Sequence, residues 1–161
     1  MNRIVYSGTF DPITRGHEDI VRRVSGLFDE VILAVAASER KRPLFDLATR
    51  VQLAQTALAD YANVRVEPFC GLLRDFLQAQ GAKAVVRGLR NVTDFDYEFN
   101  MAGVNRQLCP ELETLFITPS EPYWFVSASM VREIAAFGGD VSRFVHPAVQ
   151  AALTTTFPPQ P

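Results

Sequence analysis

A turn-rich stretch near the N-terminus carries residue types that bind phosphate. Gly8 lets the main chain turn sharply and lets a ligand approach closely, and Thr9 offers a hydroxyl group and a main-chain N–H. Gly16 and His17 open the helix pattern that follows, and the free N–H groups and dipole of a helix N-terminus attract anions. Thr14 and His17 are three residues apart, so their side chains can face the same ligand. The stretch therefore predicts a phosphate site at which His17 donates a hydrogen bond.

A simpler interpretation of this stretch has Thr14 as the N-cap of the helix and His17 exposed to solvent. The whole string favours the phosphate site, because glycines, a proline and a Thr-x-Gly-His segment lie between a hydrophobic strand pattern and an amphipathic helix pattern. The string matches neither the GxxxxGK[ST] pattern nor the GxGxxG pattern. It therefore argues against a P-loop ATPase and against a dinucleotide-binding Rossmann domain.

Basic residues follow other predicted strands. Lys41 stands in the segment 38–43, where a flexible point charge can reach a phosphate group. Its neighbours Arg40 and Arg42 are interpreted as solvated charges of the same loop. Local basic clusters in a chain of nearly neutral charge fit a small anionic ligand better than a polyanion.

Arg87 and Arg90 bracket a Gly-Leu pair just beyond another strand pattern. Arg87 directly continues an apolar run, which is an awkward place for a charge unless an anion meets it. A guanidinium fork matches phosphate oxygens with two hydrogen bonds. The alternative for either arginine is an ion pair with Asp94 or Asp96, which follow closely in the chain.

Four further residues allow both a structural and a functional interpretation. From the sequence alone, Glu98 is expected on the solvated face of a helix, and Leu73 is expected in the core from its spacing with neighbouring apolar residues. Ser127 and Ser129 precede a helix pattern, where they can act as N-caps or add hydroxyl and N–H donors to a second anion site.

Strand and helix patterns alternate along the chain. Strands are predicted at 3–7, 31–37, 64–67, 83–87 and 114–118. The first helix, which Gly16 and His17 open, carries apolar residues between Ile20 and Phe28 on one face, and further helices are predicted at 46–59, 72–80, 94–108, 129–137 and 147–155. This alternation predicts βαβ units and hence an α/β fold, a Rossmann-like five-stranded parallel sheet with helices on both faces. Such sheets bind ligands beyond the carboxyl ends of their strands, near a topological switch point.

Several single residues mark the expected boundaries and faces of the helices. Asp46 is the predicted N-cap of the helix at 46–59, and Gly81 is predicted to end the helix at 72–80. Pro147 lies in the first turn of the last helix. Phe95 and Phe99 share one side of the helix at 94–108.

Length and composition indicate one globular domain. The chain has 161 residues and is 48% apolar, which is enough for a sizeable core. We expect a domain over residues 1–157 and a flexible Pro-rich tail over 158–161. The longest apolar run, at 31–37, is too short to span a bilayer, and no signal-peptide pattern precedes the first strand. We therefore expect a soluble cytoplasmic protein that does not bind a membrane.

Charge and cysteine content narrow the function classes further. The formal net charge is −2, and no basic stripe or interleaved aromatic platform argues for nucleic-acid binding. Cys70 and Cys109 are the only cysteines and lack metal-ligand spacing, so they are interpreted as reduced thiols.

Several motifs follow one another over nearly the whole chain. They are Gly8-Thr9-Phe10-Asp11-Pro12 with Thr14-x-Gly16-His17; Lys41; Arg87-Gly88-Leu89-Arg90; Asp94-Phe95-Asp96-Tyr97-Glu98; and Trp124-Phe125-Val126-Ser127-Ala128-Ser129. Together they resemble the phosphopantetheine adenylyltransferase family of the T-x-G-H nucleotidyltransferase superfamily. The first motif is shared across that superfamily, whereas the third and fourth together are much more specific.

The resemblance implies a role for each matching residue. It implies catalytic roles for His17, as a transition-state stabiliser, and for Lys41 and Arg90. It implies ATP contacts by Thr9, Phe10, His17, Gly88, Leu89, Arg90, Glu98, Tyr123, Trp124, Phe125, Val126, Ser127, Ala128 and Ser129. It implies acceptor contacts by Thr9, Lys41, Leu73 and Arg87.

The resemblance also implies an activity and partners. The activity is transfer of AMP from ATP to 4'-phosphopantetheine, giving dephospho-coenzyme A and pyrophosphate without a covalent enzyme intermediate. The acceptor is already a phosphate anion, so no protein nucleophile or general base is needed. The only cofactor expected is Mg²⁺ bound through the ATP phosphates, with no metal site on the protein. Inhibition by coenzyme A and a homohexamer are further implications of the resemblance.

This sequence departs from the family pattern at a few positions. Val126 and Ala128 stand in a segment that commonly reads I-S-S-S, so one hydroxyl group is missing and any contact at Ala128 must come from the main chain. Ser7 stands where many members of the family have proline.

Two other functions are alternatives. The first is another T-x-G-H enzyme, a nicotinamide mononucleotide adenylyltransferase or a cytidylyltransferase, against which the block from Arg87 through Glu98 argues. The second is a nucleotide-binding regulator without turnover, against which the intact Thr-x-Gly-His segment argues.

Overall fold

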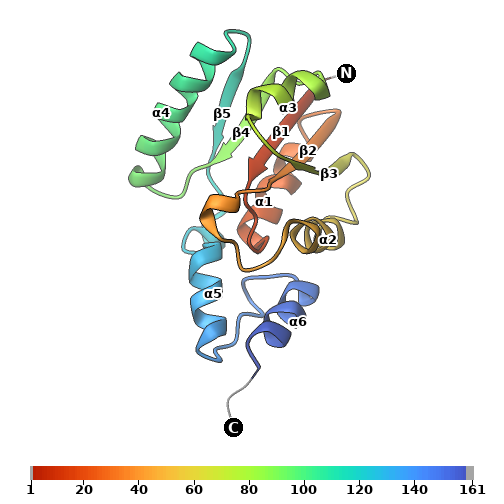
Figure 1. Ribbon diagram of the computed structural model, residues 1–161, viewed down its shortest axis with the longest axis vertical. Helices are drawn as coiled ribbons and strands as arrows, with labels where there is room; N and C mark the ends of the chain where they lie inside the picture. The colour runs from red at the N-terminus through yellow and green to blue at the C-terminus, as the bar shows by residue number, and fades with distance from the viewer. Residues whose placement is uncertain (1, 159–161) are drawn as a thin grey trace.

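The fold is built on a parallel β-sheet. The computed structural model describes residues 2–158, and its five strands are all parallel in the order β3-β2-β1-β4-β5 (Figure 1). The strands are β1 (Arg3–Gly8), β2 (Glu30–Ala36), β3 (Val64–Phe69), β4 (Ala84–Gly88) and β5 (Glu113–Ile117). The strand order reverses direction between β1 and β4, which is the switch point where open sheets bind ligands. The predicted fold class is confirmed.

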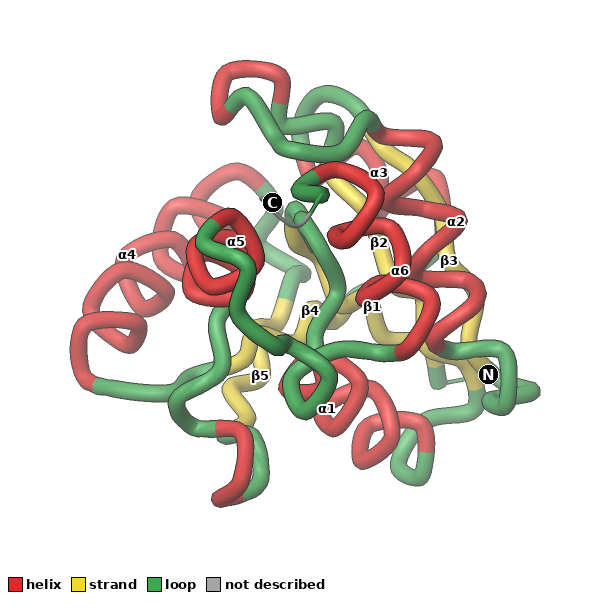
Figure 2. Tube along the Cα trace, turned by 90° about the horizontal axis from the view of Figure 1, so that it is seen from below, coloured by secondary structure: helices red, strands yellow, loops and turns green. Residues whose placement is uncertain are grey.

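Helices cover both faces of the sheet and its carboxyl end. They are α1 (Arg15–Ser25), α2 (Leu47–Ala57), α3 (Leu73–Gln80), α4 (Val92–Leu108), α5 (Ala128–Ala136) and α6 (Pro147–Thr156). Two short 3₁₀ helices, η1 (Glu39–Lys41) and η2 (Glu121–Tyr123), were not predicted from the sequence. Seen from below, α5 and α6 stand in front of the ends of the strands (Figure 2).

Two apolar clusters fill the space between the sheet and its helices. The larger one joins alternate residues of the central strands, such as Tyr6 and Leu33, to α1, α2, α5 and α6. The smaller one joins residues on the opposite face, such as Val5 and Ile32, to α3. Every residue from Val31 to Val35 is fully buried, as an unbroken apolar strand in the middle of a parallel sheet requires.

Local signals at the ends of helices behave as the sequence predicts. The side chains of Thr14, Asp46 and Ser127 accept hydrogen bonds from the main-chain N–H groups of the first turns of α1, α2 and α5. Gly81 ends α3 with a φ of +64°, a conformation that glycine adopts without a steric penalty. Ser129 does not cap α5, because it already lies inside the helix.

Helix α4 differs from the other long helices because none of its 17 residues is buried. Phe95 and Phe99, whose rings lie 5.5 Å apart, remain 42% and 60% exposed. A shared apolar side on a helix ordinarily indicates packing against the core. Within residues 2–158, α4 packs mainly against β5, where the ring of Phe95 meets that of Phe116 at 6.0 Å, and its Glu98 also reaches Arg87 of β4. Most of its apolar side therefore faces outward.

Other expectations are limited by what the structure describes. Residues 159–161 lie outside the described part, so the predicted flexible tail is not tested there. Within the described part, no helix combines the length and apolar character needed to cross a bilayer. Cys70 and Cys109 are free thiols.

Candidate active site

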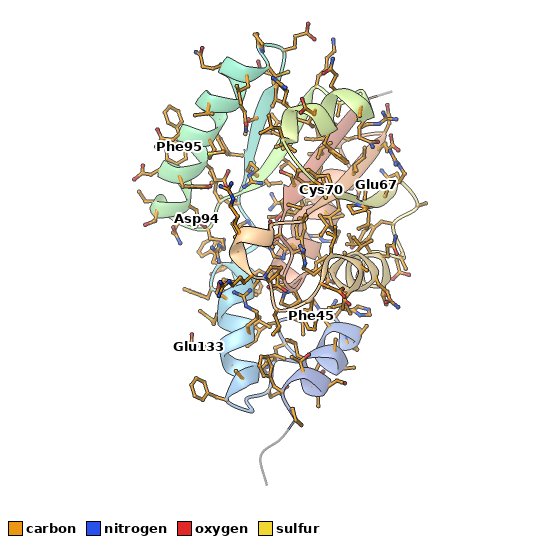
Figure 3. All side chains as sticks on the ribbon, in the orientation of Figure 1. Phe45, Glu67, Cys70, Asp94, Phe95 and Glu133 are labelled. Atoms are coloured by element: carbon orange, nitrogen blue, oxygen red, sulfur yellow. The ribbon has the colours of Figure 1, made fainter. Side chains whose placement is uncertain are left out.

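A cavity of about 430 Å³ opens beyond the carboxyl ends of β1 and β4. Its walls come from the β1–α1 turn, from the loop after β2, from the start of α4 and from the start of α5. In Figure 3, Asp94 lies at the end of α4 that is nearer to α5. The cavity therefore lies where the strand order predicts a ligand site.

The cavity brings together most of the residues predicted from the sequence. Those that line it are Thr9, Phe10, His17, Lys41, Arg87, Gly88, Arg90, Glu98, Tyr123, Ser127, Ala128 and Ser129. Those that do not line it are Leu73, Leu89, Trp124, Phe125 and Val126. Trp124 and Phe125 are 47% and 77% exposed, whereas Val126 belongs to the core. Leu73 packs at the edge of the smaller apolar cluster, as its spacing predicts.

His17 lines the cavity as a half-buried, neutral donor. The main-chain N–H of Thr14 donates to its Nδ1 at 3.0 Å. Because an amide N–H can only donate, Nδ1 must be the nitrogen without a proton. The ring proton therefore resides on Nε2, which is free to donate a hydrogen bond. Burial, assisted by the positive charge of Arg90, lowers the pKa of His17 to about 4. The ring is consequently uncharged at neutral pH.

The same contacts decide between the two interpretations of the β1–α1 turn. Thr14 is indeed the N-cap, and the reciprocal bond from its N–H to His17 completes a capping box. His17 is not exposed, however, and its ring packs edge-on against Phe10 with centroids 5.0 Å apart. Capping thus fixes the orientation of the imidazole, so the structural and functional interpretations hold together.

Arg87 is paired with Glu98 rather than with Asp94 or Asp96. Its Nε and Nη2 donate to the two oxygens of Glu98, each at 2.7 Å, while Nη1 donates to the carbonyl and hydroxyl oxygens of Ser7. Burial opposes the charge of Arg87, but the bonds and charge of Glu98 outweigh it and raise the pKa of the guanidinium. The expectation of a solvated Glu98 is wrong, because this ion pair leaves its side chain only 13% exposed.

Arg90 pairs with Asp94, as one alternative predicted. Its Nε donates to the carboxylate at 3.0 Å, and its Nη1 donates to the carbonyl of Val126 at 3.2 Å. The second bond ties the start of α4 to the segment before α5. Val126, which does not line the cavity, therefore acts on it through its main chain.

The loop after β2 brings Lys41 to the opposite side of the cavity. The side chain of Lys41 is exposed and lines the cavity. Its N–H donates to the carbonyl of Ser38 at 2.9 Å, and the hydroxyl groups of Ser38 and Thr9 lie 3.1 Å apart. Thr9 and Lys41 are thereby held on neighbouring segments that face the same space.

Gly88 brings the end of β4 close to α1. A Cβ atom built there would lie 2.6 Å from Cδ1 of Ile20 and 3.4 Å from the hydroxyl oxygen of Tyr6. The strand end therefore packs directly against α1. This close approach lets Arg87 and Arg90, on either side of it, reach into the cavity.

The sequence analysis missed three functional candidates. Asp11 is buried, and its carboxylate accepts from the N–H groups of Leu44 and Phe45 at 2.7 and 3.0 Å. Arg132 lines the cavity, donates to the carbonyl of Asp11 and lies 3.3 Å from the hydroxyl of Ser129. The signal for Arg132 was its position one turn after Ser129.

The third missed residue is Arg50, which lies on α2 outside the cavity lining. It is only 1% exposed, and burial lowers the pKa of its guanidinium, which nevertheless keeps its charge at any pH at which the protein is folded. Its spacing places it among the apolar residues of α2, and nothing else in the sequence marks it.

The charges of the cavity suit an anionic ligand. Its cationic side chains are Lys41, Arg42, Arg87, Arg90 and Arg132, and its carboxylates are Asp11, Asp94 and Glu98. All three carboxylates already bind amides or arginines. Within residues 2–158 no group of three metal-ligating side chains forms. The arrangement can hold phosphate groups and stabilise charge that develops on them.

Comparisons with known proteins agree with this chemistry. The model of the family described as cytidylyltransferase-like matches residues 5–134. A protein of Nitrosospira multiformis named phosphopantetheine adenylyltransferase is 60% identical, over 95% of this chain and 93% of its own. A protein of the same name from Methylobacillus flagellatus is 62% identical, over 94% of this chain and 95% of its own.

Solved structures show the same fold at much lower identity. A nicotinate-nucleotide adenylyltransferase candidate from Vibrio parahaemolyticus is 18% identical, with a TM-score of 0.72 over 96% of this chain and 93% of that one. Nicotinic acid mononucleotide adenylyltransferase from Plasmodium falciparum is 14% identical, with a TM-score of 0.74 over 97% and 95%. Since the family model covers most of the chain and the relatives cover nearly all of it, the chain belongs to the cytidylyltransferase-like family and, within it, to the phosphopantetheine adenylyltransferases.

Proposed function

We propose that this protein transfers AMP from ATP to 4'-phosphopantetheine, giving dephospho-coenzyme A and pyrophosphate, a step of coenzyme A biosynthesis. The observation that carries the proposal is that one cavity gathers His17, Lys41, Arg87 and Arg90, the donors that two phosphate-bearing substrates need. The names of relatives about 60% identical over the whole chain supply the acceptor.

The mechanism follows from the charge of the acceptor. A phosphate group carries between about one and a half and two negative charges at neutral pH, so its oxygen can attack the α-phosphorus of ATP unaided. A neutral His17, whose pKa lies near 4, is not needed as a base. The protein instead aligns two anions and stabilises the charge that grows on the α-phosphate. The Nε2–H of His17 and the N–H groups near Thr9 and Phe10 are the donors for that charge.

The two sides of the cavity divide the work between the substrates. Thr9, Lys41 and Arg87 would hold the acceptor phosphate, with Leu73 beside the pantetheine arm. The ATP contacts would be Thr9, Phe10 and His17, Gly88 to Arg90, Glu98, and Tyr123 to Ser129. Leu73, Leu89, Trp124 and Phe125 do not line the cavity in this conformation, so any contact they make requires the ligand to extend beyond it.

Mg²⁺ would enter this site bound to the triphosphate of ATP. The carboxylates of the cavity bind amides and arginines within residues 2–158, so the cation would take its ligands from the phosphates. Phosphate oxygens and water are the ligands that Mg²⁺ prefers. The metal would neutralise part of the phosphate charge, while the residues named above orient the two substrates.

Assembly and regulation extend the same proposal. A homohexamer, which the family resemblance implies, would bury exposed apolar residues of α4, such as Phe99 and Val104, which are 60% and 52% exposed. Phe99→Asp should then lower the sedimentation coefficient, whereas Leu27→Asp, at a lone exposed leucine near α1, should not. Coenzyme A, which contains the product, would compete for the cavity in the cytoplasm.

The deciding experiment measures pyrophosphate released from ATP with different acceptors. Phosphopantetheine should support turnover, whereas nicotinamide mononucleotide with ATP, or CTP with a sugar or polyol phosphate, should not. Turnover with one of those acceptors alone would assign the alternative enzyme class. ATP binding with no pyrophosphate from any acceptor would instead indicate a regulator.

A further inference from the structure

Arg50 makes an unusual set of contacts for a buried charge. Its Nε donates to the carbonyl of Phe45 at 3.0 Å, and its Nη1 donates to those of Thr9 and Ala36 at 2.8 and 2.7 Å. Its Nη2 donates to the carbonyl of Ala37 at 2.9 Å. All of the described hydrogen bonds of this guanidinium therefore end on main-chain oxygens.

These carbonyl groups belong to different parts of the chain. Thr9 lies in the β1–α1 turn, and Ala36 and Ala37 lie at the end of β2. Phe45, labelled in Figure 3, lies just before α2. Buried carbonyls need partners, and the ends of strands leave them without a neighbour in the ladder. Only a planar fork with several N–H donors can bind so many acceptors at once. One side chain thus fixes the turn after β1 relative to the loop after β2.

The loops that Arg50 joins contain strained backbone. All three non-glycine residues with a positive φ within residues 2–158 lie there, namely Phe10 at 48°, Ser38 at 52° and Arg42 at 46°. Each such conformation is sterically unfavourable for a residue with a side chain, so it persists only where the surrounding contacts enforce it. The bonds of Arg50 lie beside two of these residues, at Thr9 and Ala37.

A second restraint acts on the other end of the loop after β2. The carboxylate of Asp11 binds the N–H groups of Leu44 and Phe45, while Arg50 binds the carbonyl of Phe45. The loop that carries Lys41 is therefore held at both ends, by a cation through its carbonyls and by an anion through its amides.

We infer that Arg50 is a positioning residue, which holds Thr9 and Lys41 at the separation that the acceptor phosphate requires. The inference rests on the proposed function, in which these two residues bind that phosphate. Arg50 does not line the cavity, so it acts through the two loops and not by touching the substrate.

The test compares wild type with Arg50→Lys, which keeps the charge but loses the fork. The KM for phosphopantetheine should rise about tenfold or more, because small displacements of positioning groups have large effects on alignment. The KM for ATP should change several-fold less, since most of its predicted contacts lie at 88–90, at Glu98 and at 123–129, outside the two loops that Arg50 joins. Hydrogen exchange should quicken at residues 8–10 and 37–45 and stay unchanged at 123–129.

Leu153→Ala serves as the matched control, because Leu153 is buried in α6 away from both loops. It should lower the urea midpoint of unfolding, because it leaves a cavity in the core, and leave both KM values unchanged. Asp11→Asn is the second variant, should Arg50→Lys fail to fold. It removes one of the two side-chain oxygens that accept from the N–H groups of Leu44 and Phe45. It should produce a smaller rise in the KM for phosphopantetheine, again without a matching rise in the KM for ATP.

The outcomes separate this inference from the proposed function. Equal rises in both KM values, or an unchanged KM for phosphopantetheine in a folded Arg50→Lys variant, would overturn the positioning role. If wild type itself releases no pyrophosphate with phosphopantetheine, the proposed function fails. The positioning role is then decided by calorimetry with inorganic pyrophosphate: a loss of affinity of about tenfold in Arg50→Lys but not in Leu153→Ala supports it, and equal affinity refutes it.

Discussion

The two walls of the cavity are held together by different means. The inner wall (residues 8–17 and 37–45) is fastened by Arg50, Asp11 and the capping box of α1, all through main-chain groups. The outer wall (residues 87–98) is fastened by ion pairs from Arg87 and Arg90 to carboxylates on α4, a helix that buries none of its residues. The two walls therefore differ in how they can respond to a ligand. The inner wall is held through main-chain groups, whereas an anionic ligand can replace the carboxylates of the outer wall.

The largest effect is expected at His17, the catalytic donor of the inner wall. His17→Ala should lower kcat by about 10²–10³ and change both KM values little, because the lost hydrogen bond acts mainly on the transition state. Pyrophosphate release under saturating substrates measures it. The other histidine provides the control, since His146 caps α6 outside the cavity and His146→Ala should keep kcat. An undiminished kcat in His17→Ala would contradict the role.

The next effect tests the burial of the same ring through pH. The folded pKa near 4 lies below the unfolded value near 6.5, so the unfolded chain binds the proton first as the pH falls. Stability is therefore full above pH 6.5 and falls by about 3 kcal/mol towards pH 4. Urea unfolding of wild type and His17→Asn at both pH values isolates this loss. Identical pH dependence in the two proteins would show that the ring is not buried and neutral.

The outer wall is tested by the coupling between Arg87 and Glu98. A double-mutant cycle with Arg87→Met and Glu98→Gln should give an interaction energy of about 1–3 kcal/mol in unfolding free energy, because the pair is bidentate and largely shielded. The exposed pair between Arg106 and Glu113 should give less than about 1 kcal/mol in the same cycle. Equal coupling in both pairs would mean that the ion pair does not hold the outer wall.

The smallest effect concerns the residue that joins the two walls. Ser7→Ala removes the hydroxyl that accepts from Nη1 of Arg87 at 3.0 Å, although the carbonyl of Ser7 still accepts. The KM for phosphopantetheine should rise about two- to tenfold, equivalent to about 0.5–1.5 kcal/mol. Ser25→Ala, at an exposed serine at the end of α1, is the matched control. If the KM for phosphopantetheine is the same in Ser7→Ala and in Ser25→Ala, Ser7 has no role in the acceptor site.

The sequence predicted the elements of the fold well because local and global signals agree in them. The buried run of β2 and the caps at Thr14 and Asp46 lie where their patterns indicate. The outward position of Phe95 and Phe99 was not predicted, because a helical apolar stripe does not reveal whether its partner belongs to the same chain.

The candidate site was predictable where it lies on short motifs. His17, Lys41, Arg87 and Arg90 were named from their positions after strands, and the topology brings them to one cavity. The choice of Glu98 over Asp94 as the partner of Arg87 depends on how α4 crosses the sheet edge, which spacing does not give. Arg50 was missed for a similar reason, since its acceptors are main-chain groups, and main-chain groups carry no residue-type signal.

The central claim is that the cavity aligns two phosphates for direct transfer, with no nucleophile supplied by the protein. The stereochemical course at phosphorus tests this most directly. ATP made chiral at the α-phosphorus with sulfur should be converted with phosphopantetheine, and the configuration of the dephospho-coenzyme A analogue read by ³¹P NMR. The account predicts inversion, the result of a single in-line displacement. Retention would require two displacements through a covalent enzyme intermediate and would contradict it.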